Sequence, residues 1–95
     1  MPSIRLIHWN ANEAETRRAA LHRLGYSVSS RVPSPPELLR ELSASPPAAV
    51  VIDLTRTPSH GRELGIALRQ RKGTRFIPLV FVGGEPEKVA RVRAL

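Results

Sequence analysis

Polar or glycine residues follow three apolar segments of the chain, and these are the positions where chemistry could occur. Asp53 ends the most strand-like run and is the only Asp in the sequence, while His8-Trp9-Asn10 ends the first run and Gly83-Gly84 the last. If these runs are parallel strands, their carboxyl ends meet at the edge of the sheet where ligands of such folds bind. We therefore expect His8 to lie near Asp53, although two such groups do not make a catalytic site.

The other reactive side chains have simpler explanations. His22 and His60 lie far from His8 and lack the i, i+4 spacing of helical metal ligands, so no metal site is predicted. Ser59 stands beside His60 without an acid to orient the pair, which gives no support to a hydrolase triad. The glycines at 83 and 84 precede a helix start but lack the spacing of a phosphate-binding loop, so a plain turn is predicted.

Apolar runs alternate with helix-start patterns, and these predict the elements that must position the candidate residues. Strands are predicted at residues 3–9, 26–32, 48–54 and 76–82. Capping patterns at Asn12 and Ser34 and apolar stripes predict helices at residues 13–24, 35–42, 62–72 and 86–95. Helices of this length between apolar strands imply right-handed crossovers and a parallel sheet covered on both faces.

The motif around Asp53 is the most specific one in the chain. Residues 50–64, VVIDLTRTPSHGREL, resemble the phosphoacceptor region of response-regulator receiver domains. In that family an Asp ends the third strand and a Gly opens the third helix eight residues later, as Asp53 and Gly61 do here. Glu63 matches an acidic residue common two positions after that Gly, whereas Pro58 stands one place later than the family's Pro.

The resemblance extends over the chain as a topology, because residues 6–28 and 76–92 match the family's first and fourth strand–helix units. It implies an α/β, flavodoxin-like three-layer sandwich whose parallel sheet has four strands in the order 2-1-3-4, without the family's fifth strand and helix. It places Asp53 at the phosphoacceptor position. The residues that it assigns to the phosphoacceptor loop are Thr55, Thr57, Pro58 and Gly61.

The chain departs from the family at the residues that support phosphoryl transfer. The family's acidic pair, which holds Mg²⁺ at the end of the first strand, is replaced by His8 and Trp9. Because Mg²⁺ prefers carboxylate oxygens and water, a single carboxylate beside these rings is a poor site. Gly83 stands where the family has its switch hydroxyl, and the family's Lys after the fifth strand has no counterpart.

Two interpretations of Asp53 follow. Either it is phosphorylated through an altered site, or it is an inherited carboxylate that caps its loop or pairs with a nearby arginine such as Arg56. We favour the second, because phosphoryl transfer without a metal lacks compensation for the charge of the transition state. We also expect the Trp9 ring to fill part of the space that a metal and its waters would occupy.

The composition and charge of the chain limit the classes of binding partner and the cellular compartment that we expect. Fifteen Lys and Arg residues against eight Asp and Glu give a net charge of +7, which makes an anionic partner such as nucleic acid worth considering. The basic residues are spread over the chain and aromatic residues are scarce, so nucleic-acid binding is not favoured. The chain has no cysteine, no signal-peptide pattern and no apolar run long enough for a membrane span, which fits the cytoplasm.

From the resemblance and its departures we predict a non-catalytic pseudo-receiver. It would act as a signalling and protein-interaction module of a bacterial two-component-like system, without enzymatic activity and without a cofactor. Two alternatives stay open. One is a functional receiver that is phosphorylated on Asp53, and the other is a basic protein associated with nucleic acid.

The predicted sheet has one strand fewer than the family's, so the strand at residues 76–82 is expected to present an open edge. We interpret the chain as a single domain, residues 1–95, truncated at its C-terminus. A protein partner, most simply a second copy in a homodimer, would cover this edge and the last helix. The residues predicted to form the contact are Phe76, Leu79, Phe81, Val89, Val92 and Leu95.

Overall fold

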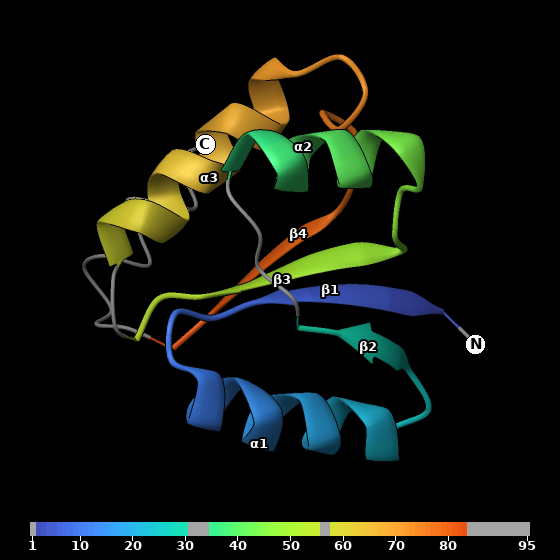
Figure 1. Ribbon diagram of the computed structural model, residues 1–95, viewed down its shortest axis with the longest axis vertical. Helices are drawn as coiled ribbons and strands as arrows, with labels where there is room; N and C mark the ends of the chain where they lie inside the picture. Colours follow the sequence, from blue (N-terminus) through green and yellow to red (C-terminus); the bar gives the residue numbers. More distant parts are fainter. Residues whose placement is uncertain (1, 31–34, 56–57, 84–95) are drawn as a thin grey trace.

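Strands and helices alternate in the computed structural model, which describes residues 2–30, 35–55 and 58–83 (Figure 1). The strands are β1 (Ser3–Ile7), β2 (Ser27–Ser29), β3 (Ala49–Asp53) and β4 (Leu79–Val82). The helices are α1 (Ala11–Arg23), α2 (Pro35–Ala44) and α3 (Pro58–Gln70). Within these ranges no helix has the length and apolar character needed to cross a membrane.

All pairings within the sheet are parallel, in the order β2-β1-β3-β4. Helix α1 covers one face of the sheet, while α2 and α3 cover the other (Figure 1). The predicted fold class and strand order are therefore confirmed. The register sets Leu6 beside Val51 and Asp53 beside Val82, so the carboxyl ends of β1, β3 and β4 lie together.

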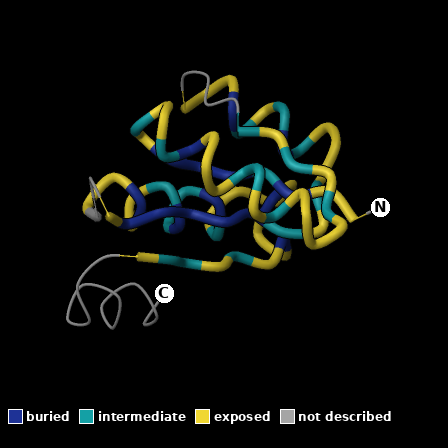
Figure 2. Tube along the Cα trace, turned by 90° about the horizontal axis from the view of Figure 1, so that it is seen from below, coloured by how far each residue is buried: buried dark blue, intermediate teal, exposed yellow. Residues whose placement is uncertain are grey.

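The core is divided by the sheet into two clusters, because successive side chains of a strand point to opposite faces. Ile4, Leu6 and Val51 form the smaller cluster on the α1 side. The larger cluster combines residues of β1 and β3 with residues of α2 and α3, namely Ile7, Leu38, Leu42, Val50, Ile52, Leu54, Leu68 and Ile77. β3 is buried from Val50 to Asp53, and Figure 2 shows such buried stretches at the centre of the molecule.

Two helices begin earlier than the sequence predicts. Helix α1 is capped by Asn10 rather than Asn12, because the Asn10 side chain accepts a hydrogen bond from the Glu13 N–H at 3.0 Å. The same capping pattern occurs at both positions, and the one nearer to the end of β1 is used. Helix α3 begins at Pro58 instead of residue 62, consistent with the preference of proline for the first turn.

Some other boundaries also differ. Helix α2 extends to Ala44, into the segment 43–47 that was predicted to break it. The strands are shorter than predicted, and β2 pairs with β1 over only three residues. The predicted N-cap Ser34 and the predicted helix at 86–95 lie outside the described residues.

The prediction that the last strand begins at Phe76 is wrong, because the chain turns until residue 77. The buried Thr74 hydroxyl donates to the Leu68 carbonyl at 2.8 Å, and Arg69 Nη1 donates to the carbonyls of Arg75 and Ile77. These bonds tie the turn to the end of α3. Phe76 is left 84% exposed, with the Arg75 guanidinium 4.8 Å from its ring centroid.

Gly61 is required by the packing of α3 against β3. A Cβ atom at this position would lie 2.5 Å from Leu54 Cδ2 and 3.0 Å from Ile52 Cγ2, which is closer than carbon atoms approach. The glycine therefore lets the first turn of α3 lie directly on the strand that carries Asp53.

We predict that Gly61→Ala lowers the free energy of unfolding by about 1–3 kcal/mol through overpacking, although alanine normally stabilises a helix relative to glycine. Urea denaturation measures the effect. In a Leu54→Val background, which lacks the clashing Cδ2 atom, the same substitution should cost less. Equal costs in the two backgrounds would mean that the close approach is not the reason for the glycine.

Candidate functional site

Asp53 is the centre of the candidate site and is completely enclosed. Its side chain has no solvent exposure. One carboxylate oxygen, Oδ1, accepts a hydrogen bond from the Thr55 N–H at 2.8 Å, which fixes the start of the loop after β3. The other, Oδ2, is buried without a hydrogen bond. A buried carboxylate needs compensation for its lost hydration, so the groups around Oδ2 decide what this site can do.

His8 is brought to Asp53 as predicted. The imidazole is buried, and its Nε2 lies 3.6 Å from Asp53 Oδ2 and 3.3 Å from Glu13 Oε2. Nδ1 accepts a hydrogen bond from the Asn10 N–H at 3.1 Å, so the ring proton is on Nε2, between the two carboxylates. The backbone that begins α1 thus sets both the tautomer and the orientation of the ring.

Arg17 supplies the principal compensating charge, and the sequence analysis missed it. Its Nε lies 2.8 Å from Asp53 Oδ2, an ion pair in which the N–H is not aligned for a hydrogen bond. The predicted alternative, Arg56, lies outside the described residues. The sequence feature that could have indicated Arg17 is its helical spacing. Arg17 follows Glu13 by one turn and therefore shares its face of α1.

These four residues, Asp53, His8, Glu13 and Arg17, are called the Asp53 cluster below. A cavity of about 440 Å³ adjoins the cluster and is lined by His8, Glu13, Thr16, Arg17, Ala20 and Thr55. Asp53 is not part of that lining. The carboxylate is therefore screened from solvent by the residues that compensate it.

The donor set of this cluster does not fit Mg²⁺. Among the described residues no group of three histidine or acidic side chains is arranged to hold a metal ion. The buried oxygen Oδ2 faces a guanidinium and an imidazole N–H, which take the place that a divalent cation would need.

At Gly83, the position predicted for the switch hydroxyl, Thr55 fills the space that a side chain would need. Gly83 has φ +71°, and a Cβ on it would overlap the Thr55 hydroxyl and lie 3.2 Å from Asp53 Oδ1. A larger residue at 83 would therefore have to displace Thr55. The hydroxyl nearest to position 83 thus comes from Thr55, in the loop after β3, and not from β4.

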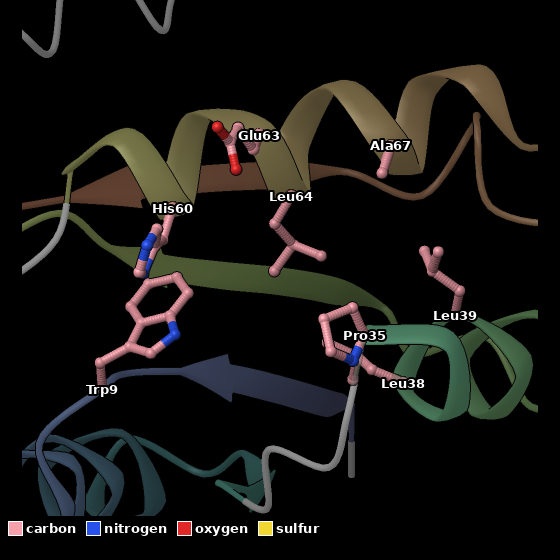
Figure 3. A pocket seen from close by; sticks show the side chains of 8 residues that line it. All are labelled: Trp9, Pro35, Leu38, Leu39, His60, Glu63, Leu64 and Ala67. Atoms are coloured by element: carbon pink, nitrogen blue, oxygen red, sulfur yellow. The ribbon is translucent and has the colours of Figure 1, made fainter.

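The expectation that Trp9 fills space beside Asp53 is wrong. Trp9 follows the alternation of β1 to the opposite face, where its ring lies against His60 of α3 with the ring centroids 5.9 Å apart (Figure 3). His8 and Trp9 thus contribute to two different environments. His22 lies near the Tyr26 carbonyl at 3.3 Å, so the three histidines do not gather at one site.

The other predicted loop residues have separate places. Thr57 lies outside the described residues, and Pro58 begins α3. Gly61 packs on β3. Glu63, which matched the family's acidic position, is exposed on α3 and lines the cavity that contains Trp9, away from the Asp53 cluster.

Comparison with models of protein families and with curated protein sequences gives no match. Comparison with solved structures gives several receiver domains. The N-terminal domain of a response regulator receiver protein from Methanoculleus marisnigri JR1 is 24% identical at a TM-score of 0.76, over 99% of this chain and 78% of that one. Chemotaxis protein CheY4 of Vibrio cholerae is 19% identical at a TM-score of 0.76, over 99% and 79%.

A third similar structure is the signal receiver domain of a signal transduction histidine kinase from Syntrophus aciditrophicus. It is 24% identical at a TM-score of 0.73, over 96% of this chain and 70% of that one. At such identities the likeness concerns the backbone. The chain therefore has the flavodoxin-like fold of response-regulator receiver domains, as the sequence resemblance implied.

We predict that Arg17→Met lowers the free energy of unfolding by about 1–3 kcal/mol, because it leaves the buried Asp53 carboxylate with less compensation. The effect lies below that of a fully buried pair, since the Arg17 side chain is 43% exposed. Chemical denaturation measures it. Combining Arg17→Met with Asp53→Asn should cost less than the sum of the two single substitutions.

Arg18→Met is the matched control on the same helix. Arg18 pairs with Glu15 on the surface at 2.6 Å, a bond that lowers the pKa of Glu15 and raises that of Arg18. Exposed pairs of this kind contribute little to stability. If Arg17→Met is no more destabilising than Arg18→Met, then Arg17 does not compensate Asp53.

Proposed function

We propose that this chain is a pseudo-receiver, a signalling and interaction module of a two-component-like system that acts through its surface without phosphoryl chemistry. The observation that supports the proposal is the state of the Asp53 carboxylate. It is enclosed, its Oδ1 is bonded to the Thr55 N–H, and its Oδ2 is paired with Arg17. The receiver fold of the similar structures supports the signalling part.

The electrostatics of the Asp53 cluster favour a structural role for the carboxylate. Phosphoryl transfer requires an accessible acceptor oxygen and cationic compensation at the transferred group. Here the positive charge of Arg17 is directed at the acceptor itself in the resting protein. A divalent cation would have to displace this guanidinium and would then find a protonated imidazole nitrogen, Nε2 of His8, on the same oxygen.

A small phosphodonor tests this role directly. After incubation of the chain with acetyl phosphate and Mg²⁺, we expect its intact mass to stay unchanged, because Asp53 is screened and the groups that face its Oδ2 atom do not suit Mg²⁺. The double variant His8→Asp with Arg17→Ala restores one carboxylate and removes the competing cation, and it should show measurable Mg²⁺ affinity if it remains folded. A phosphoryl adduct on the unmodified chain that disappears in Asp53→Asn would contradict the proposal.

We further propose that the outer edge of β4 pairs with a second copy of the chain. Within the described residues β4 pairs with β3 only, and Val80 of this strand is 46% exposed. Leu79 and Phe81 pack partly against the larger core cluster, while Phe76 projects from the preceding turn. Unpaired strand edges associate readily, and a two-fold axis would satisfy both edges at once.

The other residues predicted for this contact, Val89, Val92 and Leu95, lie outside the described residues. The proposal for the edge therefore depends on β4 and on the turn before it.

Light scattering at micromolar concentration should give twice the chain mass of 10.5 kDa. Val80→Lys places a charge on the strand edge and should yield the monomer, since edge lysines oppose strand pairing. Leu24→Lys is the matched control, because Leu24 is an exposed apolar residue at the end of α1, away from β4. A stable monomer of the unmodified chain would show that the edge does not mediate association.

A further inference from the structure

A groove of about 540 Å³ lies between α2 and α3 on the face of the sheet opposite α1 (Figure 3). It is called the α2–α3 groove, and the residues that line it are Trp9, Pro35, Leu38, Leu39, His60, Glu63, Leu64 and Ala67. Figure 3 shows Leu64 pointing into the space between Trp9 and Pro35, with Ala67 further along α3. The groove is separate from the Asp53 cluster and has no part in the role proposed for it.

The size and lining of this groove suit a small molecule. Ligand sites in proteins are concave, mostly apolar and of roughly 300–1,000 Å³, with a few polar groups that set orientation. Here leucine side chains from both helices form the apolar walls. Ala67 leaves open a part of the groove that a longer side chain would fill.

One end of the groove is aromatic. The Trp9 and His60 rings are tilted by 59° to each other, and Trp9 is 37% exposed. It is the only tryptophan of the chain, so a large apolar ring remains partly in water within a hollow that could cover it. Faces of aromatic rings attract cations that approach within about 6 Å.

The one charged residue that lines the groove is Glu63. It is the only acidic residue of the lining, and no ion pair joins it to another of the described residues. This exposed carboxylate lines an apolar groove in a chain whose net charge is +7. The groove therefore combines a negative rim, an aromatic end and an apolar wall.

We propose that the α2–α3 groove is a binding site for a small amphiphilic amine with an aromatic or alicyclic body. The ammonium group lies against the Glu63 carboxylate and the aromatic end, and the apolar body covers Leu38 and Leu64. Binding removes the exposed face of Trp9 from water. This site involves neither phosphorylation nor the β4 edge. The outcome of its test is therefore independent of the tests of the proposed function.

Trp9 itself reports on binding, because no other tryptophan contributes to the fluorescence. The probes are 4-tert-butylbenzylamine, its neutral analogue 4-tert-butylbenzyl alcohol and its anionic analogue 4-tert-butylbenzoate, titrated into the chain at mildly alkaline pH. We expect a saturable change in Trp9 fluorescence with the amine, at a Kd roughly fivefold below that of the alcohol, the factor given by a cation contact of ~1 kcal/mol. The benzoate should bind most weakly.

Two variants locate the site. Glu63→Gln should abolish the preference for the amine over the alcohol, whereas Glu37→Gln, the same change on α2 outside the lining, should leave it intact. Ala67→Leu should weaken all three probes by filling the groove, with circular dichroism confirming that the variant is folded. Absence of saturable binding, equal affinity for the three probes, or a preference that survives Glu63→Gln would each overturn the proposal.

Discussion

The burial of one carboxylate constrains much of this structure. Asp53 ends the central strand β3 with no solvent exposure, and leaving such a charge without a partner would cost about 3–5 kcal/mol. Arg17 reaches it from the second turn of α1, so the ion pair joins the helix on one face to the strand at the centre of the sheet. The position of α1 and the state of the site are therefore linked.

The receiver fold here encloses its Asp53 carboxylate with contacts made inside the chain. A guanidinium and an imidazole N–H stand where a metal-binding site would need further carboxylates. The Thr55 hydroxyl occupies the space above Gly83, which removes room for a side chain there. These side chains fill the space of the site with contacts made inside the chain. Together these contacts compensate the buried Asp53 charge with groups of the chain itself.

The two residues at the end of β1 contribute to opposite sides of the molecule. His8 continues the row of Ile4 and Leu6 toward α1, while Trp9 continues the row of Ile7 toward α2 and α3. Adjacent residues of a strand point to opposite faces, which is why the dipeptide His8-Trp9 contributes to both the Asp53 cluster and the α2–α3 groove. One face thus has a closed, charged cluster and the other an open, mostly apolar groove.

The sequence by itself determined the order of the elements, the parallel sheet and the meeting of His8 with Asp53, because apolar runs, caps and strand ends are local patterns. The face on which Trp9 lies also follows from the alternation of β1, and our prediction was wrong because it placed both residues of the pair on one side. Only the tertiary structure decided that Arg17 pairs with Asp53, that Thr55 takes the space beside Gly83 and that Phe76 lies in a turn. These outcomes depend on the distance between elements that are remote in sequence, and that distance is set by side-chain packing across the whole domain.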